Sequence, residues 1–287
     1  MEVETTIRDV RSRRHAERTD GVRAALVPTM GFLHEGHLSL VRRAHELADR
    51  VWVSVFVNPT QFGPGEDLDR YPRDLERDLE LLDAEDVDAV FAPPVSEMYP
   101  RPPVVEISFS GLERVLCGAS RPVHFGGVGL VVSKLINIVQ PEVAVFGQKD
   151  AQQALLIRRL VADLDMPVTV DVAPTVRETD GLAMSSRNAY LSEEERRAAP
   201  VLYRALQAAA DAIRGGERQP ELVTAVMRDI IGTEPLIALE YADCVRQDDL
   251  RIADRITSPV LLAVAARAGS TRLIDNLPVD PSPEEIA

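Results

Sequence analysis

The feature that most constrains this chain is the alternation of short apolar runs with amphipathic segments in its first half. Residues 24–28 and 51–57 are apolar and rich in β-branched side chains, which predicts two buried strands. Between them, residues 37–49 repeat apolar side chains at three- and four-residue spacing, the pattern of an amphipathic helix. A strand, a helix and a strand in some thirty residues predict a βαβ unit and therefore a parallel sheet.

The same alternation continues toward residue 172. We expect further strands and helices there, at residues 73–84 (helix), 87–92 (strand), 127–139 (helix), 143–146 (strand), 151–164 (helix) and 168–172 (strand). Repeated βα units favour an α/β fold with a Rossmann-like, doubly wound parallel sheet. Such a sheet binds its ligands at the carboxyl ends of the strands.

The composition changes after about Pro174. Residues 193–215 and 221–231 have helical patterns, and residues 237–245 and 260–265 have strand patterns. We therefore expect two domains, a Rossmann-like one over 1–175 and a smaller α+β one over 176–287. The tail from about residue 278 is rich in Pro and Glu, which predicts disorder.

Charge and cysteine usage narrow the function. The formal net charge of −14 argues against a nucleic-acid or membrane-surface protein, because such proteins need a basic surface. No apolar run reaches the roughly 18–20 residues that span a bilayer, and the charged N-terminus does not resemble a signal peptide. Two distant cysteines suit a reducing compartment. We expect a cytoplasmic protein.

The stretch from Pro28 to His37 contains the strongest chemical signal. It leaves a predicted strand, turns at Gly31 and enters a helix near Gly36. Free N–H groups and the positive end of the helix dipole favour a bound phosphate at such a junction, and His34 and His37 add donors. The glycines allow a nucleotide to approach the backbone closely.

Other interpretations of the two histidines remain open. They could be zinc ligands, although no third ligand is obvious, or ordinary capping or surface residues. A Rossmann dinucleotide loop and a P-loop are both disfavoured, because their glycine patterns are missing. The spelling H-x-G-H after a strand resembles the signature of nucleotidyltransferases and class I aminoacyl-tRNA synthetases, which act at the α-phosphorus of ATP.

Three further segments fit a nucleotide site. Residues 181–187 end in two hydroxyls and a guanidinium, Ser185, Ser186 and Arg187, which suit phosphate oxygens. Residues 56–62 and 146–150 each follow a predicted strand, and Lys149 in the second is a natural countercharge for phosphate. A solvated surface lysine is the alternative interpretation of Lys149.

Ordered motifs along nearly the whole chain resemble the pantothenate synthetase (pantoate–β-alanine ligase) family of the HxGH superfamily. They are P-T-M-G-F-L-H-E-G-H-L-S-L-V at 28–41, F-V-N-P-T-Q-F at 56–62, E-D-L-D-R-Y-P-R at 66–73, S-R-P-V-H-F at 120–125, F-G-Q-K-D-A-Q-Q at 146–153, V-R-E-T-D-G-L-A-M-S-S-R-N at 176–188 and T-R-L-I-D-N at 271–276.

The resemblance implies a reaction and its participants. It implies an ATP-dependent ligase that joins pantoate to β-alanine through a pantoyl-adenylate and releases AMP and diphosphate. ATP with Mg²⁺ and the two small acids would be its ligands, and a homodimer its assembly. The sequence identifies no residue that binds the metal.

The resemblance also implies residue roles. Catalysis would involve His34, His37, Lys149, Ser186 and Arg187, with His37 a proton donor. ATP would contact Pro28, Thr29, Met30, Gly31, His34, Gly36, His37, Gly147, Lys149, Asp150, Val176, Met184, Ser185, Ser186 and Arg187. Pantoate would contact Gln61, Gln153, Asn58, Tyr71, Val128, Val131 and Val132.

The chain departs from the family pattern at Val123, Gly126 and Leu130, where glycine, arginine and threonine are common. These departures bear on helix packing and dimer contacts more than on the reaction. Two other functions remain open, namely a different HxGH nucleotidyltransferase and a non-catalytic nucleotide-binding protein.

Overall fold

The computed structural model describes residues 1–281, which form two compact units. The N-terminal unit comprises Met1–Arg114, Gly118–Gln148 and Gln153–Pro174, and the C-terminal unit comprises Val115–Cys117, Lys149–Gln152 and the chain from Thr175. The chain therefore passes from one unit to the other several times. The division into autonomous domains 1–175 and 176–287 remains a prediction.

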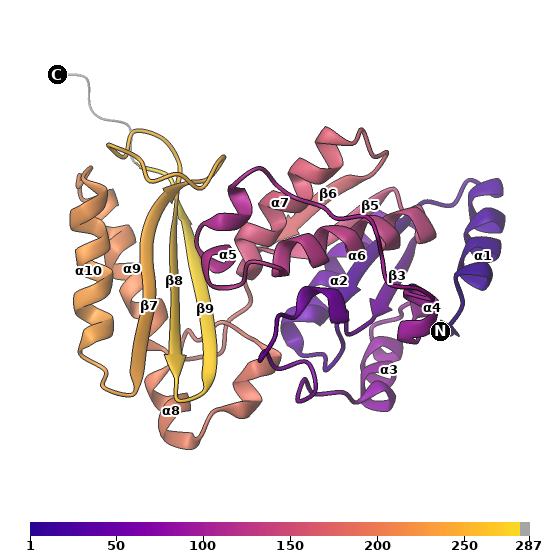
Figure 1. Ribbon diagram of the computed structural model, residues 1–287, viewed down its shortest axis with the longest axis horizontal. Helices are drawn as coiled ribbons and strands as arrows, with labels where there is room; N and C mark the ends of the chain where they lie inside the picture. Colours follow the sequence, from indigo (N-terminus) through magenta and orange to yellow (C-terminus); the bar gives the residue numbers. More distant parts are fainter. Residues whose placement is uncertain (282–287) are drawn as a thin grey trace. The chain divides into compact units, whose positions relative to one another are not determined.

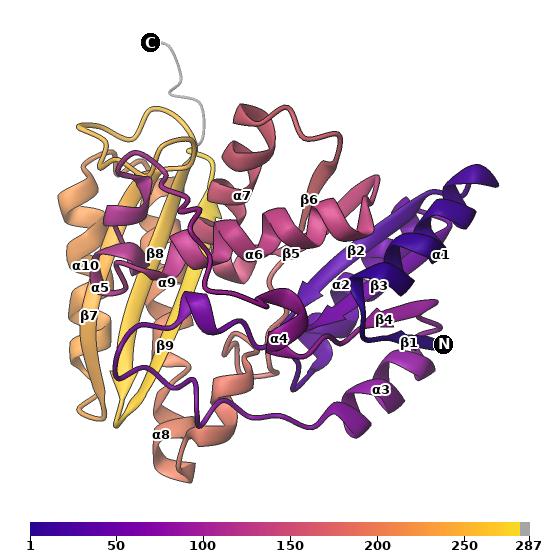
Figure 2. The same ribbon diagram turned by 45° about the vertical axis from the view of Figure 1, so that its right-hand side comes forward.

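A parallel sheet is the centre of the N-terminal unit (Figures 1 and 2). Its strands are β1 (Glu2–Glu4), β2 (Ala24–Thr29), β3 (Arg50–Val55), β4 (Ala89–Phe91), β5 (Val143–Gly147) and β6 (Thr169–Ala173), in the spatial order β1-β4-β3-β2-β5-β6. The chain builds outward from β2 through β3 to β4, then returns to add β5 and β6 on the other side of β2. The predicted doubly wound sheet is confirmed, and its switch point lies between β2 and β5.

Helices cover both faces of this sheet. They are α1 (Ile7–Thr19), α2 (Glu35–Leu47), α3 (Leu75–Ala84), α4 (Val95–Met98), α6 (His124–Val139) and α7 (Ala151–Asp163). Alternate residues of β2 point into different apolar clusters. Leu26 joins Val10 of α1 and Leu135 of α6, whereas Val27 joins Val41 of α2. This alternation is the period of a strand that is buried on both faces.

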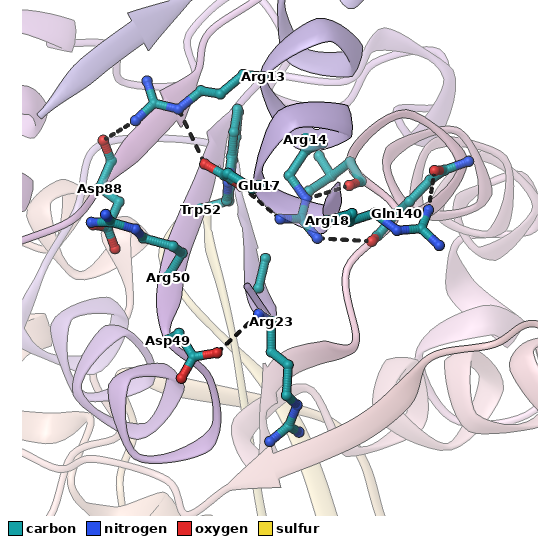
Figure 3. Close-up of polar contacts among 12 residues, drawn as sticks. Arg13, Arg14, Glu17, Arg18, Arg23, Asp49, Arg50, Trp52, Asp88 and Gln140 are labelled. Atoms are coloured by element: carbon teal, nitrogen blue, oxygen red, sulfur yellow. Dashed lines mark hydrogen bonds and ion pairs between the residues drawn. The ribbon is translucent and has the colours of Figure 1, made fainter. Parts of the chain in front are cut away.

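The amino ends of the strands are held by ion pairs and hydrogen bonds (Figure 3). Arg14 of α1 is almost fully buried, and its guanidinium donates to Val139 O at 2.9 Å and to Glu17 at 2.6 Å. Trp52 of β3 donates to the same Glu17 at 3.2 Å, which ties α1 to the sheet. This end of the sheet is therefore occupied by structural contacts.

The C-terminal unit contains a three-stranded antiparallel sheet with two helices packed on it (Figure 1). The strands are β7 (Ile237–Arg246), β8 (Val260–Ala268) and β9 (Thr271–Val279). The two helices on the sheet are α9 (Val201–Arg214) and α10 (Pro220–Gly232), and the short helix α8 (Glu193–Ala198) precedes them. Its apolar cluster draws on α9, α10 and all three strands, so this unit has a core of its own.

Short helices complete the fold. They are η1 (Pro59–Gln61), η2 (Leu112–Arg114), α5 (Cys117–Ser120), η3 (Gln148–Asp150) and η4 (Ser186–Tyr190).

Several elements differ from the sequence predictions. The helix expected over 193–215 is two helices, because Pro200 interrupts it between α8 and α9. The elements β1, α1 and β9 were not predicted. The tail predicted to be disordered from about residue 278 starts inside β9, which runs to Val279, and residues 282–287 lie outside the described part.

Candidate active site

The loop after β2 turns sharply at Gly31. Gly31 has a φ of +81°, and a Cβ there would lie 2.9 Å from Asp78 Oδ2. Its N–H donates to Thr29 Oγ1 at 3.2 Å, and that hydroxyl donates to Ser54 O in the next strand at 2.8 Å. The turn therefore needs glycine for both its backbone angle and its lack of a side chain.

Asp78 of α3 holds the next two residues of this loop. Its carboxylate, only 1% exposed, accepts the N–H groups of Phe32 and Leu33, each at 2.7 Å. Burial raises the pKa of the Asp78 carboxyl, and the two N–H groups oppose that rise. The sequence predictions missed this residue. It lies four residues before Leu82, on the apolar face of α3, and a carboxylate on such a face is the sequence signal that could have identified it.

His34 and His37 form the start of α2. His34 is the N-cap, and its Nδ1 accepts the N–H of Gly36 at 3.1 Å, while Nδ1 of His37 accepts the N–H of His34 at 3.3 Å. The ring centroids are 4.1 Å apart. Because both Nδ1 atoms accept, each neutral ring carries its proton on Nε2. The pair thus provides two Nε2–H donors at a helix N-terminus, where the dipole favours an anion.

A group of polar side chains lies beside this loop. Gln61 Nε2 contacts Met30 Sδ at 3.0 Å, and Asn58 Nδ2 donates to Gln61 Oε1 at 3.0 Å. Tyr99, absent from the sequence predictions, donates to Asn58 Oδ1 at 2.9 Å. The structure therefore brings together Met30 from the motif at 28–41 with Asn58 and Gln61 from the motif at 56–62.

The motif at 120–125 anchors the Gln61 segment. Arg121 donates to Gln61 O at 3.3 Å and pairs with Glu66 at 2.5 Å, and His124 Nδ1 lies 3.0 Å from the same Gln61 carbonyl. Burial alone would raise the pKa of the Glu66 carboxyl, but the Arg121 guanidinium, together with His124 and the backbone of Gly63, lowers that pKa below its ordinary value. This motif therefore has a clear structural role in the N-terminal unit.

The remaining residues predicted to bind pantoate are buried or half-buried. Val128, Val131 and Val132 are buried in the core cluster of the N-terminal unit, Tyr71 is buried with its ring 6.1 Å from Phe62, and Gln153 is half-buried in α7. Contact between these valines and a ligand would use the small part of each side chain that is still accessible.

The predicted phosphate-binding residues of the C-terminal unit lie in two segments. Lys149 and Asp150 are in η3, where Lys149 Nζ lies 3.4 Å from Asp150 Oδ1. Val176 and Met184 face each other across a hairpin, since the Met184 N–H donates to Val176 O at 3.0 Å. Ser185 then caps η4, which contains Ser186 and Arg187.

The other predicted ATP-binding positions follow the topology. Pro28 and Thr29 end β2, Gly36 is in the first turn of α2, and Gly147 ends β5. The loops after β2 and β5 thus start at the switch point of the sheet, where ligands of such folds bind. Within residues 1–281 no three His, Cys, Asp or Glu side chains gather as a metal site. No helix in the same range is long and apolar enough to cross a membrane.

Comparison with known proteins identifies the family. The family model described as pantoate-beta-alanine ligase matches residues 2–278. The chain belongs to the pantoate–β-alanine ligase family. It is 58% identical over 251 residues to the pantothenate synthetase of Roseiflexus castenholzii, covering 88% of this chain and 90% of that protein. Identity to the pantothenate synthetase of Pelotomaculum thermopropionicum is 53% over 276 residues, covering 96% and 98%.

Solved structures of the family agree with this fold. A pantothenate synthetase from Thermus thermophilus matches with a TM-score of 0.91 and 45% identity, covering 96% of this chain and 99% of that one. A pantoate-beta-alanine ligase from Francisella tularensis, described as complexed with beta-gamma ATP and beta-alanine, matches with a TM-score of 0.81 and 33% identity, covering 98% and 100%.

Proposed function

We propose that this chain condenses (R)-pantoate with β-alanine at the expense of ATP, through a pantoyl-adenylate. The observation that carries the proposal is the family match over residues 2–278, and the histidine pair with its Nε2–H donors at the start of α2 supports it. The ligands named for the Francisella structure, an ATP species and β-alanine, also support it.

In the first step, a carboxylate oxygen of pantoate attacks the α-phosphorus of ATP. The bond from that phosphorus to the bridging oxygen breaks, and diphosphate leaves with the electron pair. His34, His37, Lys149, Ser186 and Arg187 stabilise the charge that develops on the phosphates, with His37 Nε2–H as the proposed proton donor. Positioned donors and cations suffice here, because phosphoryl chemistry depends mainly on alignment and electrostatic stabilisation.

In the second step, the amine of β-alanine attacks the acyl carbon of the adenylate. A C–N bond forms, the bond from the acyl carbon to the AMP oxygen breaks, and the amine loses a proton. The products are pantothenate and AMP.

Ligand contacts are assigned by the resemblance. Gln61 and Gln153 would bind the hydroxyls and carboxylate of pantoate, with Asn58 and Tyr71 nearby. Val128, Val131 and Val132 would contact its gem-dimethyl group. ATP would be bound by Pro28, Thr29, Met30, Gly31, Gly36, Gly147, Asp150, Val176, Met184 and Ser185 together with the catalytic residues.

Three finer points belong to the same proposal. Mg²⁺ enters with the phosphates of its substrate, ATP. The protein is a homodimer, and it works in the cytoplasm. Size-exclusion chromatography with light scattering tests the second point, and a single-chain mass in the presence of all substrates would contradict it.

The decisive experiment measures diphosphate release by the purified protein with Mg²⁺ and ATP. We expect limited release when pantoate is added alone, and sustained turnover with AMP formation when β-alanine is also present. Diphosphate release that does not depend on pantoate but increases with another nucleotidyl acceptor would favour a different nucleotidyltransferase. ATP binding without release under any condition would favour a non-catalytic protein.

A further inference from the structure

The motif at residues 271–276 has no role in the reaction described above. Its last two residues, Asp275 and Asn276, are consecutive in β9, yet they are only 4% and 5% exposed. Burying a polar side chain costs free energy unless its hydrogen bonds are made, so both residues need partners inside the protein.

The partner of Asn276 is the backbone of Lys149. Asn276 Nδ2 donates to Lys149 O at 2.8 Å. This carbonyl belongs to η3, so the bond fixes the peptide from which the Lys149 side chain leaves the backbone. Lys149–Gln152 is also assigned to the C-terminal unit, which is consistent with anchoring by β9.

The partner of Asp275 is Arg177. The guanidinium donates to both carboxylate oxygens, at 2.7 and 3.0 Å, and also to Gly181 O at 3.1 Å. Its carbon lies 3.8 Å from the centroid of the Tyr203 ring. A bidentate pair of this kind has a fixed orientation.

Arg177 in turn belongs to the hairpin of residues 176–184. Glu178 N–H donates to Leu182 O at 2.8 Å, and Met184 N–H donates to Val176 O at 3.0 Å. The ion pair therefore holds the whole hairpin, and with it the start of the segment Met184–Arg187, against β9.

The two anchors are coupled. The N–H of Asn276 donates to Asp275 Oδ1 at 2.7 Å, and Arg177 donates to Asn276 O at 3.3 Å. Burial raises the pKa of the Asp275 carboxyl, while the guanidinium of Arg177 and the ammonium of Lys149 oppose the rise. A single pair of residues thus contacts Lys149, in one proposed phosphate-binding segment, and Arg177, in the hairpin that leads to the other.

We propose that Asp275 and Asn276 are positioning residues, which hold Lys149 and the segment Val176–Arg187 in the arrangement that binds the phosphates of ATP. This inference rests on the proposed function. Neither side chain needs to touch the nucleotide for its loss to impair the reaction, because misplacing the binding groups by about 1 Å can cost on the order of a hundredfold in rate.

The test compares Asn276→Ala with Leu273→Ala, a buried apolar position on the same strand without these contacts. We expect Asn276→Ala to raise KM for ATP and to lower kcat, about tenfold or more in kcat/KM, with KM for pantoate changed less than twofold. Leu273→Ala should lower Tm at least as much but leave KM for ATP near the wild-type value at a temperature where it is folded.

Two results would overturn the inference. One is a folded Asn276→Ala protein with wild-type kcat and KM for ATP. The other is a shared kinetic defect in both variants that follows their loss of Tm. Failure of the proposed function is distinguishable from both, because the wild-type protein itself would then show no pantoate-dependent diphosphate release.

Discussion

His37 is the proposed proton donor, because its Nδ1 accepts the N–H of His34 and this leaves the proton of the neutral ring on Nε2. We expect His37→Ala to slow adenylation roughly 100- to 1000-fold, the cost of about 2.7–4 kcal/mol that is typical for one transition-state donor. Diphosphate release with pantoate alone measures this step. His45→Ala, an exposed histidine on the same helix, is the matched control and should behave as the wild type. Full activity in a folded His37→Ala protein would remove His37 from the mechanism.

The buried Asp78 carboxylate is expected to favour activity at a cost in stability. Burial raises the pKa of its carboxyl above the ordinary value of about 3.9, yet the ionised form holds the loop before His34. We expect Asp78→Asn to lower activity about tenfold or more without a matching loss of stability, because the amide has only one acceptor oxygen. The exposed Glu80→Gln on the same helix is the control.

The same pKa shift sets a pH dependence. Asp78 binds a proton more tightly in the folded protein than in the unfolded chain, because its pKa is raised on folding. Its contribution to the free energy of unfolding is therefore complete below about pH 3.9 and declines as pH rises through the folded pKa. The stability of the wild type relative to Asp78→Asn should therefore decline over this window and become constant above it. Urea unfolding from pH 4 to pH 8 measures this. A difference that grows with pH would contradict the assignment.

At the scale of elements, the close approach of α6 to η1 leaves no room for a larger side chain at Gly127. A Cβ at Gly127 would lie 2.2 Å from Thr60 O and 2.6 Å from Gln61 N, both backbone atoms. We expect Gly127→Ala to destabilise the fold by about 1–3 kcal/mol and to lower activity, because η1 contains Gln61. Gly232→Ala, with open space around it, should be neutral or slightly stabilising. Equal Tm values for the two variants would show that α6 can move.

The elements that could be predicted are those whose sequence pattern is local, and the elements that were missed depend on contacts between distant residues. β2, α2 and β3 were predicted because their patterns are local. In contrast, α1 has Val10 as its only buried apolar residue and is held by Arg14, whose acceptor Val139 is 125 residues away. Strand β9 was missed because its buried Asp275 and Asn276 interrupt the apolar alternation.

The candidate site shows the same division. His34, His37, Gln61 and Lys149 could be predicted because they lie in motifs of a familiar family. Asp78 and Tyr99 are far in the sequence from the residues of those motifs that they contact. Their roles therefore became visible only from the hydrogen bonds to Leu33 and Asn58. No short-range pattern in one sequence encodes such distant contacts.

At the scale of the whole molecule, each unit contains a natural probe of its own unfolding. Trp52, the single tryptophan, is buried in the N-terminal unit, and Cys244 is buried in the C-terminal unit, where burial raises the pKa of its thiol to about 12. Because each unit has a separate apolar core, we expect two urea transitions with different midpoints. Tryptophan emission reports unfolding around Trp52. Alkylation of the thiol reports unfolding around Cys244, and peptide mapping distinguishes Cys244 from Cys117. Superimposable curves would show that the units unfold as one.

The repeated passage of the chain between the two units limits how this protein can be recombined with its relatives. A chimera joined at residues 174 and 175 would bring in Asn276 from one parent while keeping Lys149 from the other. The hydrogen bond between them would then join backbones of different ancestry. Exchange should succeed when residues 149–152 travel with the C-terminal unit, so that the module which can be inherited or transplanted is discontinuous in sequence.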